Sequence, residues 1–449
     1  MGGPRVGAAV LNRIWLGLVL VSVATAAWNG RMEAVSTASL ESAKDAVELV
    51  IKLTGGMVLF LGLVRIASEG GLLRVFVRLL RPILRRLFPD VPEDHPALGA
   101  ILMNFAANML GLGNAATPFG IRAMIELDEL NPHRGSATNA MALFLAINTS
   151  SIVLLPPTGT VMVRLATDSA MPFAIWVPTL IATTCSTVVA VGTCLLLGRL
   201  RAFRPRPEPG PPPTRRSRED LPEATLPGLE EGSVPTSGWQ WALVVGFGIA
   251  VASGLAHELG QRVPEMGLGP YLRDVFSVYW LLPLLIAGFV LIGVVGRVPV
   301  YDALVEGGKE GLQVAVRITP YLVAILVAVA MFRASGALDL LLRVLGPVAA
   351  SVGAPAEALP MALLRPLSGS GAFGVMTEIL KTHGPDSFVG LVTSTLQGST
   401  ETTFYVLAVY LGAVGIRDTR HIVPACLAGD LAGFLGAVAA CHLFFAALA

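Results

Sequence analysis

A polar cluster, Gln397-Gly-Ser-Thr-Glu401-Thr-Thr403, lies between two apolar runs that are long enough to lie in a membrane. The interior of a bilayer neither hydrogen-bonds an exposed backbone nor solvates a carboxylate, so such a cluster must face protein or a water-filled cavity. A charged group at the bilayer centre costs roughly 2.5–3.5 kcal/mol. Two interpretations remain open: a polar helix end at the membrane interface, or a broken helix that presents side chains and backbone to a solute.

Composition predicts an all-α polytopic membrane protein. Hydrophobic residues make up 54% of the chain and charged residues only 14%, against about 25% charged in an average soluble domain. The apolar runs suit helices rather than barrel strands. The four cysteines lie in apolar segments without metal-ligand spacing, and no Walker, zinc or nucleophile motif occurs. We therefore predict no cofactor, no metal site and no catalytic residue, and we expect no enzymatic activity.

The charge pattern divides the chain into three parts. Residues 199-238 combine a proline-rich run and later acidic residues with Arg199, Arg201, Arg204, Arg206, Arg215, Arg216 and Arg218. This composition predicts a disordered cytoplasmic linker between two membrane halves, residues 1-198 and 239-449. Because the linker has no aromatic interleaving and no folded module, we expect no nucleic-acid partner.

The N-terminal region allows two interpretations. Residues 11–28 are apolar and follow Arg5 and Arg13, and Ala24-Thr-Ala26 resembles a signal-peptide cleavage site. The alternative, which we favour, is a retained first helix with a cytoplasmic N-terminus. We expect residues 31–45 to lie outside the membrane and residues 47–64 to form the second spanning helix.

Each half then shows the same order of features. In the first half, a surface helix with a basic face (72–88) precedes a hairpin broken at Gly111–Pro118, a helix broken after Asn148-Thr-Ser-Ser151, and a span over 173–197. The broken hairpin is interpreted as re-entrant, and a single spanning helix kinked at Pro118 is the alternative. In the second half we expect a helical hairpin (239–256 and 278–295), a cytoplasmic segment (297–311), a span (312–331), a surface helix (338–345) and a final span (422–445).

These features predict an inverted repeat. The order over residues 45-197 recurs over 306-445, with Phe119-Gly120 and Phe373-Gly374 just after each glycine-containing break. Counting spans from a cytoplasmic N-terminus, the first copy begins outside and the second begins inside. The surface helix of copy one has five arginines, whereas that of copy two has only Arg343 beside Asp339, as the positive-inside rule requires for opposite orientations. Such repeats with broken helices place a solute site near the membrane midplane.

Four motifs resemble known families. Asn104-Phe-Ala-Ala-Asn-Met-Leu-Gly-Leu-Gly-Asn-Ala-Ala-Thr-Pro-Phe-Gly120 and Trp28-Asn-Gly-Arg-Met-Glu-Ala-Val35 resemble spore maturation protein A. Arg365-Pro-Leu-Ser-Gly-Ser-Gly-Ala372 and Gln397-Gly-Ser-Thr-Glu-Thr-Thr-Phe-Tyr-Val-Leu-Ala-Val-Tyr410 resemble spore maturation protein B. The chain therefore looks like a fusion of the two, and the continuity of the A-like motif with residues 11–28 is our reason for retaining the first helix. Both halves also resemble the nucleoside-recognition or Gate domain of concentrative nucleoside transporters and of the FeoB iron transporter.

The resemblance implies a function and a partner. In the nucleoside transporters a Gly-Gln-Thr-Glu-like hairpin tip contacts the nucleoside, and Gln397, Thr400 and Glu401 stand in a similar string that departs from it by inserting Gly398 and Ser399. The FeoB GTPase module is not matched. The spore proteins are associated with core dehydration and cortex maturation and often neighbour a D-alanyl-D-alanine carboxypeptidase. A cell-envelope enzyme of that kind is therefore an expected partner.

The candidate site residues are polar groups at the breaks. Glu401 is the leading candidate for contact with a solute or a cation, and the alternative is a structural pair with Arg365. Asp430, inside an apolar span, suggests proton or sodium coupling, and a hydrogen bond to a neighbouring helix is its alternative. Arg365 itself could contact an anionic solute or snorkel to the interface. The remaining candidates could line a midplane site or cap helix ends: Asn114, Thr117, Asn148, Thr149, Ser150, Ser368, Ser370, Gln397, Ser399, Thr400 and Thr402.

The sequence thus predicts a multi-pass transporter-like protein of the bacterial inner membrane, with its N-terminus and linker cytoplasmic. Its expected partners are the lipid bilayer, a small polar solute that is nucleoside-like or a cell-envelope metabolite, and, as a further option, a second copy of itself. The alternative is a non-transporting scaffold or regulator of peptidoglycan enzymes. An intramembrane hydrolase is disfavoured because no His/Asp/Ser or metal-ligand set is recognisable. Tolerance of Glu401→Gln and Asp430→Asn would favour the scaffold.

Overall fold

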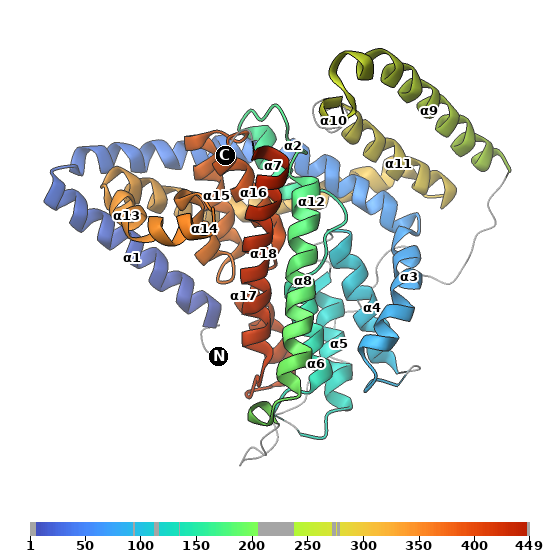
Figure 1. The fold of residues 1–449 in the computed structure, drawn as a ribbon, viewed down its shortest axis with the longest axis horizontal. Coiled ribbons are helices and arrows are strands. Elements are labelled where there is room, and N and C mark those ends of the chain that lie inside the picture. The colour runs from blue at the N-terminus through green and yellow to red at the C-terminus, as the bar shows by residue number, and fades with distance from the viewer. Residues whose placement is uncertain are drawn as a thin grey trace.

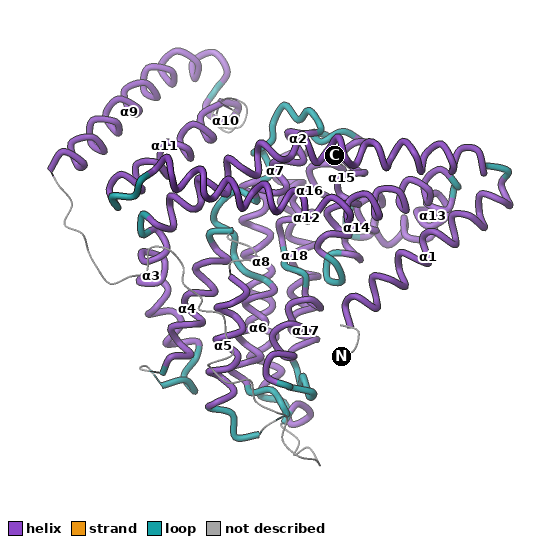
Figure 2. Tube along the Cα trace, turned by 180° about the vertical axis from the view of Figure 1, so that it is seen from behind, coloured by secondary structure: helices purple, strands orange, loops and turns teal. Residues whose placement is uncertain are grey.

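The computed structural model describes residues 6–92, 95–111, 116–133, 135–204, 238–271, 275 and 279–446, and these residues are almost entirely helices and their connecting loops (Figures 1 and 2). The first half contributes α1 (Val6–Asn29), α2 (Met32–Glu69), α3 (Leu72–Leu87), α4 (Pro96–Met109), α5 (Thr117–Glu129), α6 (Asn139–Thr149), α7 (Thr158–Ala166) and α8 (Trp176–Gly198). The predicted linker is described only to Arg204, and the rest of it lies outside the described residues.

The second half repeats this series after a helical hairpin. It contributes α9 (Gly238–Met266), α10 (Leu268–Pro270), α11 (Leu281–Val295), α12 (Val300–Ala334), α13 (Ala337–Ser351), α14 (Leu359–Leu364), α15 (Gly369–His383), α16 (Phe388–Ser399), α17 (Thr403–Val414) and α18 (Ile422–Phe445). By length and composition, α2, α8, α9, α12 and α18 could each cross a membrane. The predicted all-α polytopic membrane fold is confirmed.

Short polar side chains set the starts of the broken helices. Thr138, Ser368 and Ser387 are the N-cap residues of α6, α15 and α16, and each accepts a hydrogen bond from a backbone N–H three residues on. An N-cap oxygen satisfies one of the backbone donors that a helix start leaves free. Pro118 lies in the first turn of α5, where its missing N–H is not needed. The predicted breaks therefore occur where the sequence places helix starts.

Two helices extend well beyond the predicted spans into polar segments. Residues 31–45, predicted to lie outside the membrane, begin α2 at Met32, and residues 300–311 of the expected cytoplasmic segment form the first turns of α12. For residues 300–311 the reason is packing, because this part of α12 lies directly against residues 57–62 of α2. A Cβ built on Gly311 would lie 2.7 Å from the carbonyl oxygen of Met57, and one on Gly307 would lie 2.6 Å from that of Leu61. Glycines spaced four apart let helix backbones approach closely in membrane proteins.

The α2–α12 pair is antiparallel. Gly311 meets Met57, Gly307 meets Leu61, and Gly296, just before α12, meets Gly70, just after α2. Along the contact, the residue numbers on α12 therefore fall as those on α2 rise.

The last helices of the two copies pack in the same way. A Cβ on Gly429 of α18 would lie 2.9 Å from Ala190 Cβ of α8, and a Cβ on Gly436 would lie 3.2 Å from Ala182 Cα. The hydroxyl of Ser186 donates to the Gly429 carbonyl at 2.8 Å. This pair is also antiparallel. Equivalent helices run antiparallel when two copies are related by a two-fold axis in the membrane plane, which is the arrangement of an inverted repeat.

Loops at opposite ends of the broken helices also join the halves. At the end of α7, the buried Arg164 guanidinium donates to Asp386 Oδ1 at 2.7 Å and to the Pro385 carbonyl at 2.6 Å; we call this contact the Arg164 junction. After α17, Ser136 pairs with Asp418 through a parallel bridge and a 3.0 Å side-chain hydrogen bond, and Arg420 Nη1 donates to the Ala137 carbonyl at 2.8 Å; we call this contact the Asp418 junction. In each junction, the loop after the second part of the broken helix in one copy (after α7 or α17) contacts the loop before the broken helix in the other copy (before α16 or α6).

The Asp418 junction predicts a pH dependence of stability. His421 is fully buried, and burial, followed by the charge of Arg420, lowers the pKa of His421 to about 4. Between pH 4 and the ordinary histidine pKa of about 6.5 the unfolded chain binds the extra proton, so stability rises with pH across this window and is complete above it. The full shift corresponds to roughly 3 kcal/mol. The midpoint of thermal unfolding in detergent should therefore rise between pH 4.5 and 6.5, and His421→Leu should flatten the rise. If the unfolding midpoint of the variant rose with pH as steeply as that of the wild type, His421 would not be the cause of the pH dependence.

Candidate functional site

The two broken helices meet through their backbones. In copy one α6 ends at Thr149 and α7 begins at Thr158, and in copy two α16 ends at Ser399 and α17 begins at Thr403. The backbone N–H of Glu401 donates to the Thr149 carbonyl at 2.8 Å, so an unwound segment of one half is joined to a helix end of the other. Irregular backbone at membrane depth is tolerated only where protein or water satisfies it.

Arg365 holds the unwound segment of copy two. Its side chain comes from the break between α14 and α15 and is 7% exposed. It donates to the carbonyl of Gln397 at 3.1 Å, to the hydroxyl of Thr402 at 3.0 Å and to the carbonyl of Thr400. The carbonyls at a helix end lack helical donors, and a guanidinium can supply several donors in one plane. Arg365 is therefore turned inward rather than extended to an interface.

The acidic candidates differ in environment. Asp430 accepts a hydrogen bond from Thr403 Oγ1 at 2.7 Å through Oδ2, while its Oδ1 is buried and has no partner in the described part of the chain. The side chain of Glu401 is exposed and makes no ion pair within 4.0 Å with Arg365, although the charges of Glu401 and Asp430 both act on that guanidinium. This hydrogen bond to Thr403 of α17 is the contact with a neighbouring helix that was the alternative interpretation of Asp430. It occupies only one of the two carboxylate oxygens.

A second unpaired acceptor lies beside the same break. Gln397 Oε1 is buried and has no hydrogen-bond partner among the described residues. Leaving a buried acceptor unpaired costs about 1–3 kcal/mol, and native structures hold few such groups. Gln397 Oε1 and Asp430 Oδ1 are therefore atoms to which a bound solute or cation could contribute the missing interaction.

Several predicted hydroxyls are used inside their own helix ends. Thr149 and Ser150 donate to the Ala146 carbonyl at 3.1 and 2.7 Å, and Ser399 donates to the Leu396 carbonyl at 2.8 Å. Ser368 caps α15, and Ser370 Oγ lies 3.5 Å from its oxygen. The hydroxyl protons of Thr149, Ser150 and Ser399 are committed to these carbonyls, and their oxygens keep the capacity to accept a hydrogen bond.

An asparagine cluster forms the copy-one side of the site. Asn148 donates to Asn104 Oδ1 at 2.5 Å, and Asn104 donates to the Ala116 carbonyl at 2.8 Å. Asn104 also lies 3.4 Å from the hydroxyl of Tyr410, whose ring packs against Gly120 closely enough to exclude any Cβ there. Thr117 begins α5 beside this cluster, whereas Asn114 lies outside the described residues.

Three of these residues were not predicted as site members: Asn104, Tyr410 and Thr403. Asn104 and Tyr410 lie on different halves, so nothing in the spacing of either half brings them together. Thr403 is the last residue of the motif around Glu401. The intramembrane acid Asp430, which needs a hydrogen-bond donor, was the sequence feature that could have indicated a role for Thr403.

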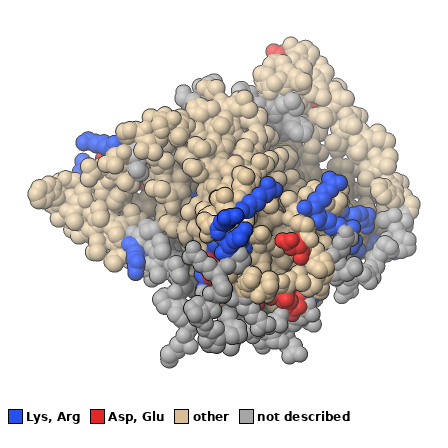
Figure 3. Space-filling view, turned by 60° about the horizontal axis from the view of Figure 1, so that its bottom comes forward, with Lys and Arg blue, Asp and Glu red and all other residues tan. Residues whose placement is uncertain are grey.

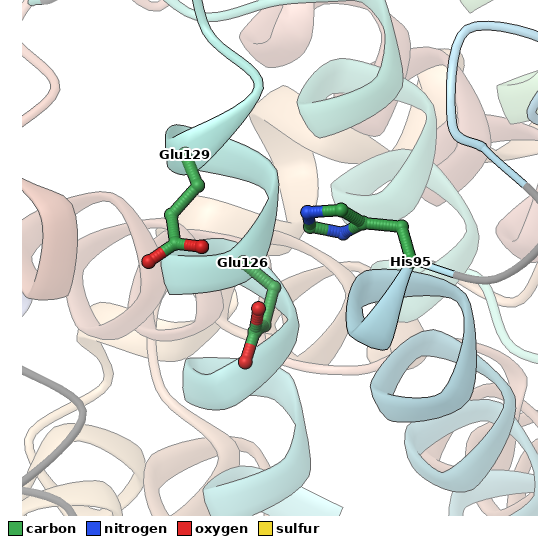
Figure 4. A group of neighbouring side chains, drawn as sticks. All are labelled: His95, Glu126 and Glu129. Carbon is green, nitrogen blue, oxygen red and sulfur yellow. The ribbon is translucent and has the colours of Figure 1, made fainter.

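A further group of potential metal ligands lies away from the break. Figure 4 shows His95, just before α4, beside Glu126 and Glu129 of α5, with their ligand atoms within 4.8 Å of one another. His95 Nδ1 accepts a hydrogen bond from the Ala97 N–H at 3.2 Å. In this tautomer Nε2 carries the proton, and neutral imidazole binds a metal only through an unprotonated nitrogen. The geometry therefore fits a helix cap that donates toward the carboxylates better than a metal site.

Comparisons with known proteins agree with this architecture. Residues 50–192 and 315–417 both match the family described as nucleoside recognition (Gate). The chain is 47% identical over 165 residues to spore maturation protein B of Bacillus subtilis (strain 168), covering 37% of this chain and 93% of that protein. It is 43% identical over 182 residues to spore maturation protein A of the same organism, covering 40% of this chain and 92% of that protein. No solved structure matches the chain.

Proposed function

We propose a transport function, starting from the fact that this chain belongs to the nucleoside-recognition (Gate) family and joins sequences similar to spore maturation proteins A and B. In this proposal the chain is a membrane protein of spore or envelope maturation. It binds a polar organic solute and moves it across the bilayer. The solute class is nucleoside-like or a cell-envelope metabolite. The binding place is the junction of α6–α7 with α16–α17. The protein does no covalent chemistry on the solute in this proposal.

One observation carries the proposal. The backbone N–H of Glu401 donates to Thr149 across the two halves, and the buried acceptors Gln397 Oε1 and Asp430 Oδ1 beside it have no partner within the described ranges. A scaffold gains nothing from unpaired buried acceptors, whereas a binding site needs groups whose interactions are completed by the ligand. Broken helices that meet between inverted copies are also the usual place of solute sites in secondary transporters.

The orientation that we propose follows from the arginines. Figure 3 brings the lower end of Figure 1 forward and shows basic side chains gathered there. The end of α8, with the residues just after it, and the loop between α17 and α18 lie at this end of Figure 1. These segments carry the arginines Arg199, Arg201, Arg204, Arg417 and Arg420. By the positive-inside rule, we assign this end to the cytoplasm. A membrane-impermeant thiol reagent should therefore label Arg204→Cys in inverted vesicles and not in intact cells. Labelling in intact cells would reverse the orientation.

The test of binding is thermal stability of the purified protein in detergent. The panel contains nucleosides, muropeptide fragments, dipicolinate, sodium and divalent ions. A ligand present at about 100 times its Kd adds roughly 2.7 kcal/mol, which raises the melting temperature. We expect one member to raise it in the wild type and not in Glu401→Gln.

The matched control is Glu41→Gln, because Glu41 is an exposed acid far from the break in sequence. It should keep the ligand-induced shift. A ligand that stabilises wild type and Glu401→Gln equally would remove Glu401 from the site. No shift with any member, together with full biological activity of Glu401→Gln and Asp430→Asn, would overturn transport and favour a scaffold or regulator of envelope enzymes.

A further inference from the structure

Two adjoining cavities lie at the start of α6, the end of α8 and the loop before α18, away from the helix breaks. Their volumes are about 500 and 210 Å³, and both are lined by Asp90, Asn139, Ala140 and Gly198. Ligand sites commonly have volumes of about 300–1,000 Å³. Together the two cavities are therefore large enough for a small organic molecule or a lipid headgroup.

The start of α6 lies in the wall of both cavities. Thr138 caps this helix by accepting from the Met141 N–H, and the backbone N–H groups of Asn139 and Ala140, which precede Met141, are in the first turn. The first backbone donors of a helix have no partner within it, and the helix dipole adds positive potential there. A helix start that lines a cavity therefore favours an anion, most often a phosphate.

The charged side chains around the cavities are mainly basic. Arg420, Arg204 and His133 line the larger cavity, and Arg199 lines the smaller one. Arg420 uses Nε and Nη1 to hold the Phe203 and Ala137 carbonyls, which fixes its guanidinium in place. Asp90 is the acidic residue of both walls, so the basic groups outnumber the acidic ones among the lining residues.

His421 gives an independent indication of a ligand. It is fully buried, it lines the smaller cavity, and neither ring nitrogen has a hydrogen-bond partner among the residues that the structure describes. A neutral imidazole offers one donor and one acceptor, and burying both without partners is costly. An anionic phosphate oxygen could accept from the ring N–H, and a hydroxyl of the ligand, such as a protonated phosphate oxygen, could donate to the other nitrogen.

The rest of the lining is apolar. Leu87, Phe88, Leu143 and Leu195 surround the smaller cavity, and Leu127 and Leu130 lie in the larger one. Leu195 is 45% exposed on the outer face of α8, the face that lipid would cover. This lining suits a ligand that has an apolar part beside its anionic group.

We propose that these cavities bind a phosphate-bearing amphiphile, with the phosphate at the α6 start between Arg420 and His421. The source of the phosphate is either the headgroup of an anionic phospholipid or a soluble phosphorylated compound. This site is separate from the solute site at the helix breaks.

The test uses Asn139→Asp in the full-length protein. An aspartate in the first turn suits the helix dipole, so the fold should be kept or slightly stabilised, while its charge repels a phosphate from the same place. Asn139→Ser is the neutral control. Melting temperatures are measured in nanodiscs of phosphatidylcholine alone, in nanodiscs with phosphatidylglycerol, and in detergent with inorganic phosphate at constant ionic strength.

We expect phosphatidylglycerol or phosphate to raise the melting temperature of wild type and Asn139→Ser, with an affinity at least tenfold weaker in Asn139→Asp. A response to phosphatidylglycerol alone identifies a lipid headgroup, and a response to phosphate identifies a soluble ligand. No response to either, or an equal response in Asn139→Asp, overturns the proposal. Glu401→Gln should leave this response intact, so failure of the solute site and failure of this site give different results.

Discussion

Replacing Arg164 with methionine is expected to destabilise the protein by about 3–5 kcal/mol, the range for removing one partner of a buried ion pair. The Arg164 side chain is fully buried and donates to Asp386, Ser394 and Ser169 and to the carbonyls of Pro385 and Met171. Methionine fills similar volume but leaves these acceptors without donors. The melting temperature of the purified variant in detergent measures the loss.

The control for this variant is Arg343→Met, because Arg343 is exposed on α13. Surface substitutions of this kind usually change stability by less than about 0.5 kcal/mol. Asp386→Asn should cost less than Arg164→Met, because the Asp386 side chain is 28% exposed and water can reach it. Equal melting temperatures for Arg164→Met and Arg343→Met would show that the Arg164 junction contributes nothing to stability.

Replacing Gly311 with leucine is expected to force α2 and α12 apart. The new Cβ alone would lie 2.7 Å from the Met57 carbonyl oxygen and 2.8 Å from its carbon, and backbone cannot rotate away as a side chain can. Overpacking of a close contact typically costs 1–3 kcal/mol, and a backbone clash belongs at or above the upper end. We expect poor recovery of folded protein and, in any recovered fraction, a markedly lower melting temperature.

Gly192→Leu provides the matched control. Gly192 lies in α8, and a Cβ there meets nothing within 4 Å. Because glycine is about 1 kcal/mol less favourable than alanine in a helix interior, the control should be neutral or slightly stabilising. If Gly311→Leu behaved like Gly192→Leu, the close α2–α12 contact would not exist in the protein.

The sequence predicts the breaks better than the helix ends. The glycine- and proline-containing interruptions at Gly111–Pro118 and around Arg365 are chemically explicit, and α18 begins and ends where the apolar run does. The starts of α2 and α12 were missed because hydropathy marks the apolar part of a helix, whereas polar turns stay helical when tertiary contacts support them. Asp45, inside the missed part of α2, pairs with Lys381 of α15 at 3.2 Å.

The site was predicted as a set of residues and not as a geometry. The motif around Glu401 and the intramembrane Asp430 are visible in the sequence because both place acids in apolar surroundings. The role of Arg365 is not visible, since its partners are mainly carbonyls that become free only when α16 unwinds. The Glu401–Thr149 contact joins residues of different halves, and it requires the packing of the two copies to be known.

The antiparallel pairing of equivalent helices has a consequence for how the chain acquires its structure. The close-packed glycines of α12 and α18, both in the second half, lie against α2 and α8 of the first half. The first half therefore leaves the ribosome before the surfaces that complete it have been made. Because the two halves are joined in one polypeptide, each first half has one second half available at high effective concentration. The two halves should consequently melt in one cooperative transition rather than as independent units.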